Sequence, residues 1–332
     1  MSKKYDVYGV GNALVDTEIE TTDEQLRDLG VEKGLMTLVD EERQEALIDA
    51  LTGVRHRLTG GGSAANTINA VAQLGGQCYY SCRIADDDNG HFFADDMRAA
   101  GVNTNVHTDK GTDGRTGTCL VMITPDAERT MNTNLGISAN LTPDQVIEDE
   151  LAAAKFLYVE GYLVSTPNSL DTAMHARKLA SKHGVKTAFT FSDPAMVQYC
   201  KDGLDEVLGD GVDLLLCNET EAKGFTGAES VEEAGDILAQ RSGVLAITCG
   251  ARGSRIWDGK AWIDIAPHAV TAIDTNGAGD LFAGAFLYGI TQGLGCEQAG
   301  KLASLGSATL VTHFGARLHP AGFAEVKQAV LG

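Results

Sequence analysis

The stretch Asp274-Thr275-Asn276-Gly277-Ala278-Gly279-Asp280 is followed at once by an apolar segment, residues 281–290. The apolar segment predicts a buried helix. The glycine-rich stretch would then form the N-terminus of that helix, where unpaired N–H groups and the positive end of the helix dipole favour an anion. The carboxylate of Asp280 next to such an anion site is explained if Asp280 acts as a general base beside a bound phosphate. The competing interpretation is a helix-start carboxylate that stabilises the dipole by about 0.3–1 kcal/mol.

Composition narrows the class of protein. The chain has 332 residues, 43% of them apolar and 22% charged, which is typical of a globular fold with one large core. Its formal net charge of −20 argues against binding to nucleic acid or to an anionic membrane. No apolar run approaches the ~20 residues of a transmembrane helix, and the first residues lack the apolar core of a secretory signal. The seven cysteines include no CxxC pair, which favours reduced thiols in the cytoplasm.

Short apolar runs alternate with helical patterns in the second half of the chain. Strands are predicted at residues 156–159, 185–191, 212–217 and 244–248, and helices at 169–183 and 230–241. This alternation predicts an α/β fold with a mainly parallel sheet and helices on both of its faces.

Two regions depart from this alternation. Residues 115–124 and 129–134 are rich in Thr, Val and Met and are joined by a turn, which predicts an antiparallel hairpin. Residues 14–19 and 35–39 also have the composition of strands. These segments predict a small second sheet, a lid over the mouth of the core, formed by insertions at about 14–40 and 103–137. We expect a single domain, residues 1–332.

A second glycine cluster, residues 60–66, reads Gly-Gly-Gly-Ser-Ala-Ala-Asn and leads into a helix with an apolar face. Gly61 and Gly62 would allow a ligand to approach the backbone, and the Asn66 amide can donate to a polyol and accept from it. On its own, such a run is more often a tight turn.

Near the N-terminus, Gly9-Val10-Gly11-Asn12 imitates the start of a dinucleotide-binding fingerprint but lacks the third glycine. Asn12 and Asp16 are polar residues in an otherwise apolar stretch. A carboxylate that accepts two vicinal hydroxyls would hold a sugar, and a capped turn with a surface aspartate is the alternative. The Walker pattern and the protein-kinase His-Arg-Asp set are absent from the sequence, so a nucleotide site would be of another kind.

Four motifs resemble those of the ribokinase family, also called the phosphofructokinase B family, and follow its order over nearly the whole chain. Residues 274–280 are similar to its C-terminal signature and residues 60–76 to its N-terminal one. Asn218-Glu219-Thr220-Glu221 is similar to its N-x-x-E motif, and Thr248-Cys249-Gly250-Ala251-Arg252-Gly253 to its nucleotide-binding loop. The resemblance implies a ribokinase-like three-layer α/β/α sandwich with a small β-sheet lid.

Within this family, the chain looks most like the adenosine kinases. That similarity rests on residues 11–16, 116–119, 129–135 and 161–168. Residues 60–66 are also similar to the corresponding segment of sugar kinases, so ribose, fructose or a related sugar is the alternative acceptor.

The resemblance implies an ATP-dependent kinase of purine salvage that phosphorylates the 5′-hydroxyl of adenosine to give AMP. Asp280 would be the base, the N–H groups of Gly277, Ala278 and Gly279 would hold the developing charge, and Arg129 would reach the phosphates from the lid. The implied substrate-binding residues are Asn12, Asp16, Gly61, Gly62, Asn66 and Tyr162, with Tyr162 stacking on the base. The implied ATP-binding residues are Asn218, Thr248, Gly250 and Gly253; Glu221 and Asn218 would organise Mg²⁺, largely through water.

Several of these residues have a structural interpretation as well. Arg129 could be a solvated hairpin charge, and Tyr162 could be part of the core. Asn218 and Glu221 could cap the helix that follows the strand at 212–217. Asp274 is interpreted as a structural turn residue.

Two other functional classes fit the sequence less well. An NAD-dependent oxidoreductase built on the Gly9 loop is disfavoured by the missing third glycine. A non-catalytic nucleoside sensor on the same fold is disfavoured by Asp280, because such a site needs no base. Monomer and homodimer both stay open, as does a monovalent cation near Gly315.

Overall fold

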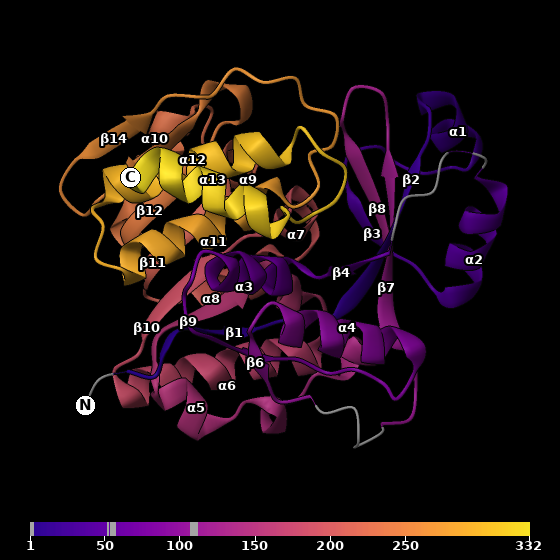
Figure 1. Cartoon of the computed structure of the whole chain (residues 1–332), viewed down its shortest axis with the longest axis horizontal. Helices are drawn as coiled ribbons and strands as arrows, with labels where there is room; N and C mark the ends of the chain where they lie inside the picture. Colours follow the sequence, from indigo (N-terminus) through magenta and orange to yellow (C-terminus); the bar gives the residue numbers. More distant parts are fainter. Residues whose placement is uncertain (1–2, 52, 54–57, 107–111) are drawn as a thin grey trace.

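The main sheet has nine strands in the order β14-β13-β12-β11-β10-β9-β1-β5-β6 (Figure 1). The computed structural model describes residues 3–51, 53, 58–106 and 112–332. The strands from β6 to β12 are parallel, and β13 and β14 extend the sheet as an antiparallel hairpin. Their bounds are β1 Tyr5–Val10, β5 Cys78–Ser81, β6 Asn103–Thr104, β9 Ala154–Glu160, β10 Lys186–Thr190, β11 Val212–Asn218, β12 Ser242–Thr248, β13 Ser254–Trp257 and β14 Trp262–Ile265.

Helices cover both faces of this sheet, as the alternation of strands and helices predicts. One face carries α3 (Ser63–Gln73), α4 (Asp88–Ala99), α11 (Ala278–Thr291), α12 (Cys296–Leu310) and α13 (Pro320–Leu331). The other carries α5 (Glu148–Ala152), α6 (Pro167–His183), α7 (Pro194–Tyr199), α8 (Lys201–Leu208), α9 (Glu219–Thr226) and α10 (Val231–Leu238). The three-layer α/β/α fold is therefore confirmed.

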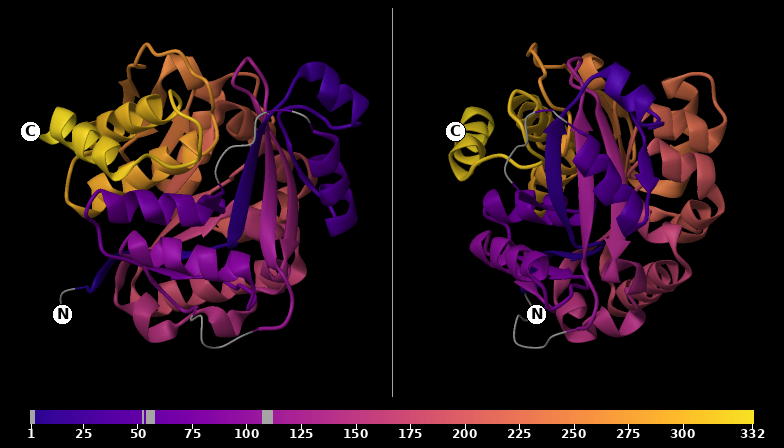
Figure 2. Two further views of the ribbon diagram at one scale, coloured as in Figure 1. Left: turned by 45° about the vertical axis from the view of Figure 1, so that its right-hand side comes forward. Right: turned by 90° about the vertical axis from the view of Figure 1, so that its right-hand side faces the viewer.

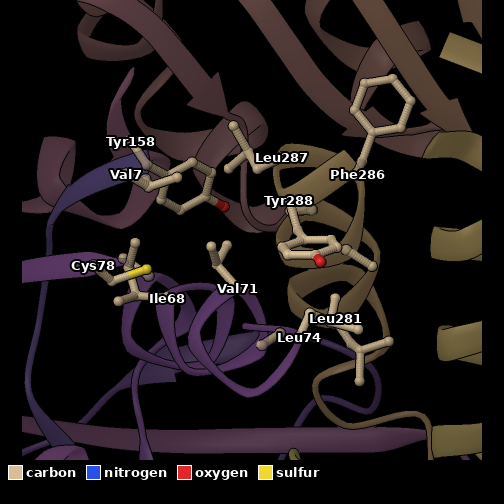
Figure 3. Close-up of a cluster of buried hydrophobic side chains, with 14 of the residues drawn as sticks. Val7, Ile68, Val71, Leu74, Cys78, Tyr158, Leu281, Phe286, Leu287 and Tyr288 are labelled. Atoms are coloured by element: carbon tan, nitrogen blue, oxygen red, sulfur yellow. The ribbon is translucent and has the colours of Figure 1, made fainter. Parts of the chain in front are cut away.

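The side chains of the central strands alternate between two separate cores. In β9, Phe156 and Tyr158 point to the α3/α11 side, whereas Leu157 and Val159 point to the α6 side. Figure 3 shows part of the first of these cores, where side chains of α3 and α11 meet side chains of β1, β5 and β9. All seven cysteines are free thiols, and none of the described helices is long and apolar enough to cross a membrane.

Close packing of α11 on α3 depends on one glycine. A Cβ at Gly284 would lie 2.5 Å from the carbonyl oxygen of Thr67, so a larger residue would separate the two helices. Since α3 carries Asn66 and α11 carries Asp280, this contact sets the distance between the two glycine-led helix starts.

A second, five-stranded sheet, called the lid below after the role expected for it, stands beside the main sheet (Figure 2). Its strand order is β3-β8-β7-β2-β4. Its strands are β2 Leu14–Glu20, β3 Met36–Leu38, β4 Thr59–Gly61, β7 Thr116–Ile123 and β8 Arg129–Gly136. The predicted hairpin is β7–β8. Two short helices, α1 (Asp23–Asp28) and α2 (Glu41–Ala50), cover one face through an apolar cluster that includes Ile19, Leu26 and Leu47. The other face turns Leu14, Cys119 and Met131 towards the core.

The lid sheet includes one strand outside the predicted insertions. This strand is β4, and the glycine cluster in it pairs through its backbone with Leu14 to Asp16. At the second insertion, β6 belongs to the main sheet, whereas β7 and β8 belong to the lid sheet. Residues 107–111 of the predicted insertion lie outside the described residues.

Candidate active site

The candidate site lies where the parallel strands of the main sheet end, beneath the lid. Asn12 follows β1, Glu160 ends β9, Ser192 follows β10 and Asn218 ends β11. Ligands of open α/β sheets bind at this carboxyl edge. All four residues line cavities that Asp280 lines too, so the topology gathers residues that are far apart in the sequence.

Asp280 sits in the first turn of α11, and both of its carboxylate oxygens are held. Ser63 Oγ donates to Oδ1 at 2.6 Å, and Asn66 Nδ2 donates to Oδ2 at 3.0 Å. Burial raises the pKa of Asp280, and the bonds from Ser63 and Asn66 oppose that rise. A carboxylate with a raised pKa, fixed in a cleft, has the properties of a general base.

The turn before α11 needs glycine at one position. Gly277 has φ +71°, and a Cβ there would lie 2.3 Å from the carbonyl oxygen of Ala316. Asp274 holds this turn together, because its carboxylate accepts the N–H groups of Asn276 and Gly315, each at 2.8 Å. Asp274 therefore has the structural role expected for it.

Gly279 faces open space beside Asp280. A Cβ at this position would meet no atom within 4 Å, and the residue lines three neighbouring cavities. One of the three predicted N–H donors is already engaged, because the Ala278 N–H donates to the Thr275 carbonyl oxygen at 3.3 Å. An anion at the start of α11 would thus meet chiefly Gly277 and Gly279.

The first cavity lies between the lid and the core and contains buried polar atoms that have no partner. Asn12 Oδ1 and Asp16 Oδ1 are both buried without a hydrogen bond among the described residues. Unpaired buried oxygens are rare in proteins and mark the place of a polar ligand or water. Gly61 is required beside them, because a Cβ there would lie 1.9 Å from Asp16 Oδ1. Gly62 has φ +95°, and a Cβ there would lie 2.4 Å from the Asn12 carbonyl oxygen.

We expect Asp16→Asn to stabilise the unliganded protein at pH 8 while weakening binding of the acceptor. Burial raises the pKa of Asp16 to about 7 from its usual value of 3.8. A carboxyl whose folded-state pKa is raised contributes stability below pH ~4, and this contribution is lost as the pH rises through ~7. Asn cannot ionise, so the substitution should raise the free energy of unfolding by about 1–3 kcal/mol more at pH 8 than at pH 5, and Tm should rise more at pH 8.

The matching measurements are thermal unfolding at both pH values and the acceptor KM, which should rise by about 100-fold or more. Asp171→Asn, on the exposed side of α6, serves as the control. An equal effect of the Asp16 substitution at pH 5 and pH 8 would show that ionisation of Asp16 carries no cost in the folded protein.

Asn66 lines the first cavity, and its amide is also engaged within the protein. Its amide oxygen accepts from Arg317 Nε at 2.8 Å, and its amide nitrogen donates to Asp280. One amide N–H is left for a substrate hydroxyl. Asn66 therefore contacts Asp280 as well as lining the cavity.

Several site residues were not predicted from the sequence. Among them, Glu160 accepts the N–H groups of Asn12 and Ala64, each at 2.7 Å, and so joins the two glycine loops; burial raises its pKa to about 7. Other polar examples are Ser63, Ser192, Arg317 and Asp193. For Glu160 a signal existed, since it is a carboxylate at the end of a buried strand.

On the lid side, Arg129 lines the same cavities as Asp280, which favours the site interpretation over a solvated charge. Tyr162 is partly buried in the first cavity, and its hydroxyl donates to Asp193 at 3.3 Å. Its ring therefore both packs on the core and faces the cavity. Met36, Met131 and Leu135 line the same cavity from the lid.

Asn218 and Glu221 form the helix cap that the alternative interpretation describes. The Asn218 side chain accepts from the Glu221 N–H, and the Glu221 carboxylate accepts from the Asn218 N–H, both at 2.8 Å. Glu221 is nevertheless buried beside Asp280, and burial raises its pKa to about 7. A buried carboxyl of this kind ionises readily only next to a cation.

The nucleotide motif lies in a neighbouring cavity. Thr248, Gly250 and Gly253 line it from the end of β12, and Phe282 and Ser307 line it from α11 and α12. Gly279 is shared by this cavity and the one beneath the lid. The predicted ATP and acceptor residues thus meet at the start of α11.

Comparison with known proteins agrees with this geometry. Residues 38–321 match the sequence model of the pfkB family of carbohydrate kinases. Adenosine kinase of Saccharomyces cerevisiae is 28% identical, over 86% of this chain and 88% of the relative. Ribokinase of Haemophilus influenzae is also 28% identical, over 81% of this chain and 86% of the relative.

Solved structures give the same fold. Adenosine kinase of Sinorhizobium meliloti superimposes with a TM-score of 0.93 at 35% identity, covering 98% of this chain and 99% of the other. A sugar-kinase candidate from Rhizobium etli CFN 42 is as similar, with a TM-score of 0.93 at 34% identity and the same coverage. A ribokinase II candidate from E. coli, solved with ATP and Mg²⁺, shares the fold at 18% identity, with a TM-score of 0.80 over 99% of this chain and 100% of the other.

Proposed function

Because this chain belongs to the pfkB family of carbohydrate kinases, we propose that it transfers the γ-phosphoryl group of ATP to the 5′-hydroxyl of adenosine, giving AMP. The chain is a phosphotransferase with an alcohol as acceptor. One observation carries the assignment of the reaction centre. Asp280 and Gly279 stand together where the cavity under the lid meets the nucleotide cavity.

In the proposed reaction Asp280 accepts the proton of the 5′-hydroxyl while the new O–P bond forms and the bond to ADP breaks. Ser63 and Asn66 keep the carboxylate in place. The N–H groups of Gly277 and Gly279 and the cation of Arg129 stabilise charge on the phosphoryl oxygens. The lid excludes water, which would otherwise accept the phosphoryl group.

The donors beside Asp280 fit Mg²⁺. Glu221 offers a buried carboxylate that a cation would keep ionised, and Asn218 offers an amide next to it. The described residues include no cluster of three His, Cys, Asp or Glu side chains placed to hold a metal ion. Glu221 and Asn218 would therefore act largely through water, which suits Mg²⁺. Bound Mg²⁺ would neutralise charge on the phosphates.

The walls of the cavity under the lid support a nucleoside rather than a sugar. Asp16 and Asn12 supply unpaired oxygen acceptors, as ribose hydroxyls require. Met36, Met131 and Leu135 line the same cavity together with Tyr162 and give it an apolar wall. The flat ring of a base would pack against these apolar side chains, whereas a free sugar would leave them without a packing partner.

A panel of acceptors tests the assignment. With ATP and Mg²⁺, adenosine should have a kcat/KM at least about 100-fold above that of ribose, fructose or 2-keto-gluconate, because the apolar wall adds a few kcal/mol only for a base. Inosine, which differs at the edge of the base, completes the panel. If ribose or fructose is the better acceptor, the protein is a sugar kinase and the adenosine assignment is wrong.

Glu221→Gln separates the two roles of Glu221. Gln keeps the capping box and cannot ionise, so Tm should not fall. The Mg²⁺ concentration for half-maximal rate should rise by about 10-fold or more. Glu233→Gln is the matched control, since Glu233 occupies the equivalent position in α10, where its N–H donates to Ser230. An unchanged Mg²⁺ requirement would leave Glu221 as a helix cap alone.

A further inference from the structure

Arg317 connects the loop after α12 to helices α3 and α4. Its Nε donates to Asn66 Oδ1 at 2.8 Å on α3, and its Nη1 donates to the Asp96 carboxylate on α4. The side chain is 11% exposed, and its Nη2 is buried without a partner among the described residues. Burying a guanidinium in this way is costly and requires these partners.

The guanidinium decides which way the Asn66 amide points. All of its polar atoms are donors, so the Asn66 atom that faces it must be the oxygen. The Asn66 nitrogen then faces Asp280 Oδ2, to which it donates at 3.0 Å. Without Arg317 the amide could turn over, and its oxygen would then repel the carboxylate.

The neighbouring backbone leaves room for this arrangement. A Cβ at Gly60 would lie 2.3 Å from Asp96 Oδ2 and 3.0 Å from Arg317 Nη1. A side chain at Gly60 would therefore displace the pair. The glycine cluster thus serves the Arg317–Asp96 contact as well as the loop around Asp16.

We propose that Arg317 is a positioning residue for phosphoryl transfer, which acts by locking the Asn66 amide against the Asp280 carboxylate. The proposal rests on Asp280 as the base of the proposed function. It makes Asp96, Arg317, Asn66 and Asp280 one chain of contacts from α4 to α11. Arg317 also brings a cation near Asp280, which favours the ionised base.

Other charged and titratable groups face Asp280 and contribute to its pH dependence. They are Asp16 on β2, Arg129 on β8, Tyr158 and Glu160 on β9, Tyr162 after β9, and Glu221 on α9. A substitution at Arg317 leaves all of these groups in place, but it also removes a cation that lowers the pKa of Asp16. The pH profile is therefore compared with that of Asp16→Asn before a change is assigned to Asp280.

Two substitutions separate orientation from charge, measured with adenosine, ATP and Mg²⁺ from pH 4.5 to 9. Arg317→Met should lower kcat/KM by about 10- to 100-fold and move the acid limb of its pH profile to higher pH, because a cation next to the base is lost. Arg317→Lys keeps the cation but cannot hold Asn66 and Asp96 together. Its acid limb should stay near that of the wild type while its rate still falls.

A double-mutant cycle tests the route through Asn66. In an Asn66→Ala background, Arg317→Lys should change kcat/KM by less than about 2-fold. Arg98→Met, which removes an exposed arginine paired with Asp95 on the same helix as Asp96, should behave as wild type. Additive effects of the two substitutions, or a wild-type rate in Arg317→Lys, would overturn the proposal, even if Arg317→Met fails to fold.

The outcome can be told apart from a failure of the proposed function. If the wild type phosphorylates ribose or fructose instead of adenosine, the same series is measured with that sugar, since the proposal concerns the base and not the acceptor. If Asp280→Asn retains the wild-type rate, Asp280 is not the base, and the proposed positioning role of Arg317 is wrong as well.

Discussion

Asp280→Asn is expected to lower the single-turnover rate of phosphoryl transfer by about 10³-fold or more, with little change in Tm. General base catalysis contributes 10²–10⁴-fold, and Asn cannot take up the hydroxyl proton. Asn can still accept from Ser63, but its amide nitrogen would face the Asn66 nitrogen, which adds a mismatch next to the reacting centre. The measurement is rapid-quench formation of AMP, together with dissociation constants for ATP and adenosine, which should stay within a few fold of the wild type.

A matched control distinguishes a base from a carboxylate that only stabilises the helix dipole. Asp202 is an exposed acid in the first turn of α8 and lines none of the three cavities that Gly279 lines. Asp202→Asn should cost at most about 1 kcal/mol of stability and leave the rate unchanged. Near-normal phosphoryl transfer by Asp280→Asn would reduce Asp280 to the same structural role.

Gly277→Ala is the second substitution with a large expected effect. At φ +71° a Cβ costs about 1–2 kcal/mol, and here it would also meet the Ala316 carbonyl oxygen at 2.3 Å. The turn must shift, and its N–H donors move with it. We expect Tm to fall by several degrees and kcat to fall by about 10²–10³-fold, the loss typical of a removed oxyanion donor.

Substitutions at two other glycines separate the effect of backbone strain from the effect of a methyl group in the phosphoryl site. Gly184 has φ +62° and open space around it, so Gly184→Ala should show the backbone strain alone, with normal kcat. Gly279 has open space and no positive φ, so Gly279→Ala should fold like the wild type and lose activity because the methyl group enters the phosphoryl site. A Gly277→Ala variant with a wild-type kcat would show that the turn does not stabilise the transferred group.

Local patterns predicted the layers of the fold and the start of α11. The apolar runs at 156–159 and 212–217 lie within β9 and β11, and the hairpin at 115–134 lies within the lid. These features depend on short-range periodicity and turn residues, which a sequence displays directly. The capping box of Asn218 and Glu221 is equally local and was foreseen as one of two interpretations.

The surroundings of Asp280 could not be predicted in the same way. Ser63 and Asn66 are more than 200 residues from Asp280, and Arg317 is 251 residues from Asn66. Each of these side chains is ordinary in its local sequence, and only the packing of α3, α11 and the loop after α12 brings them together. Likewise β4 has glycines where strands favour branched residues, so its pairing with β2 depends on the fold and not on propensity.

The most direct test of the account follows the fate of the transferred group by ³¹P NMR in a mixture of the protein, ATP, Mg²⁺ and adenosine. The account predicts that a 5′-phosphomonoester resonance grows in step with ADP, one for one, and that inorganic phosphate stays at background. Inorganic phosphate that grows in step with ADP, or no reaction although both ATP and adenosine raise Tm, would contradict it.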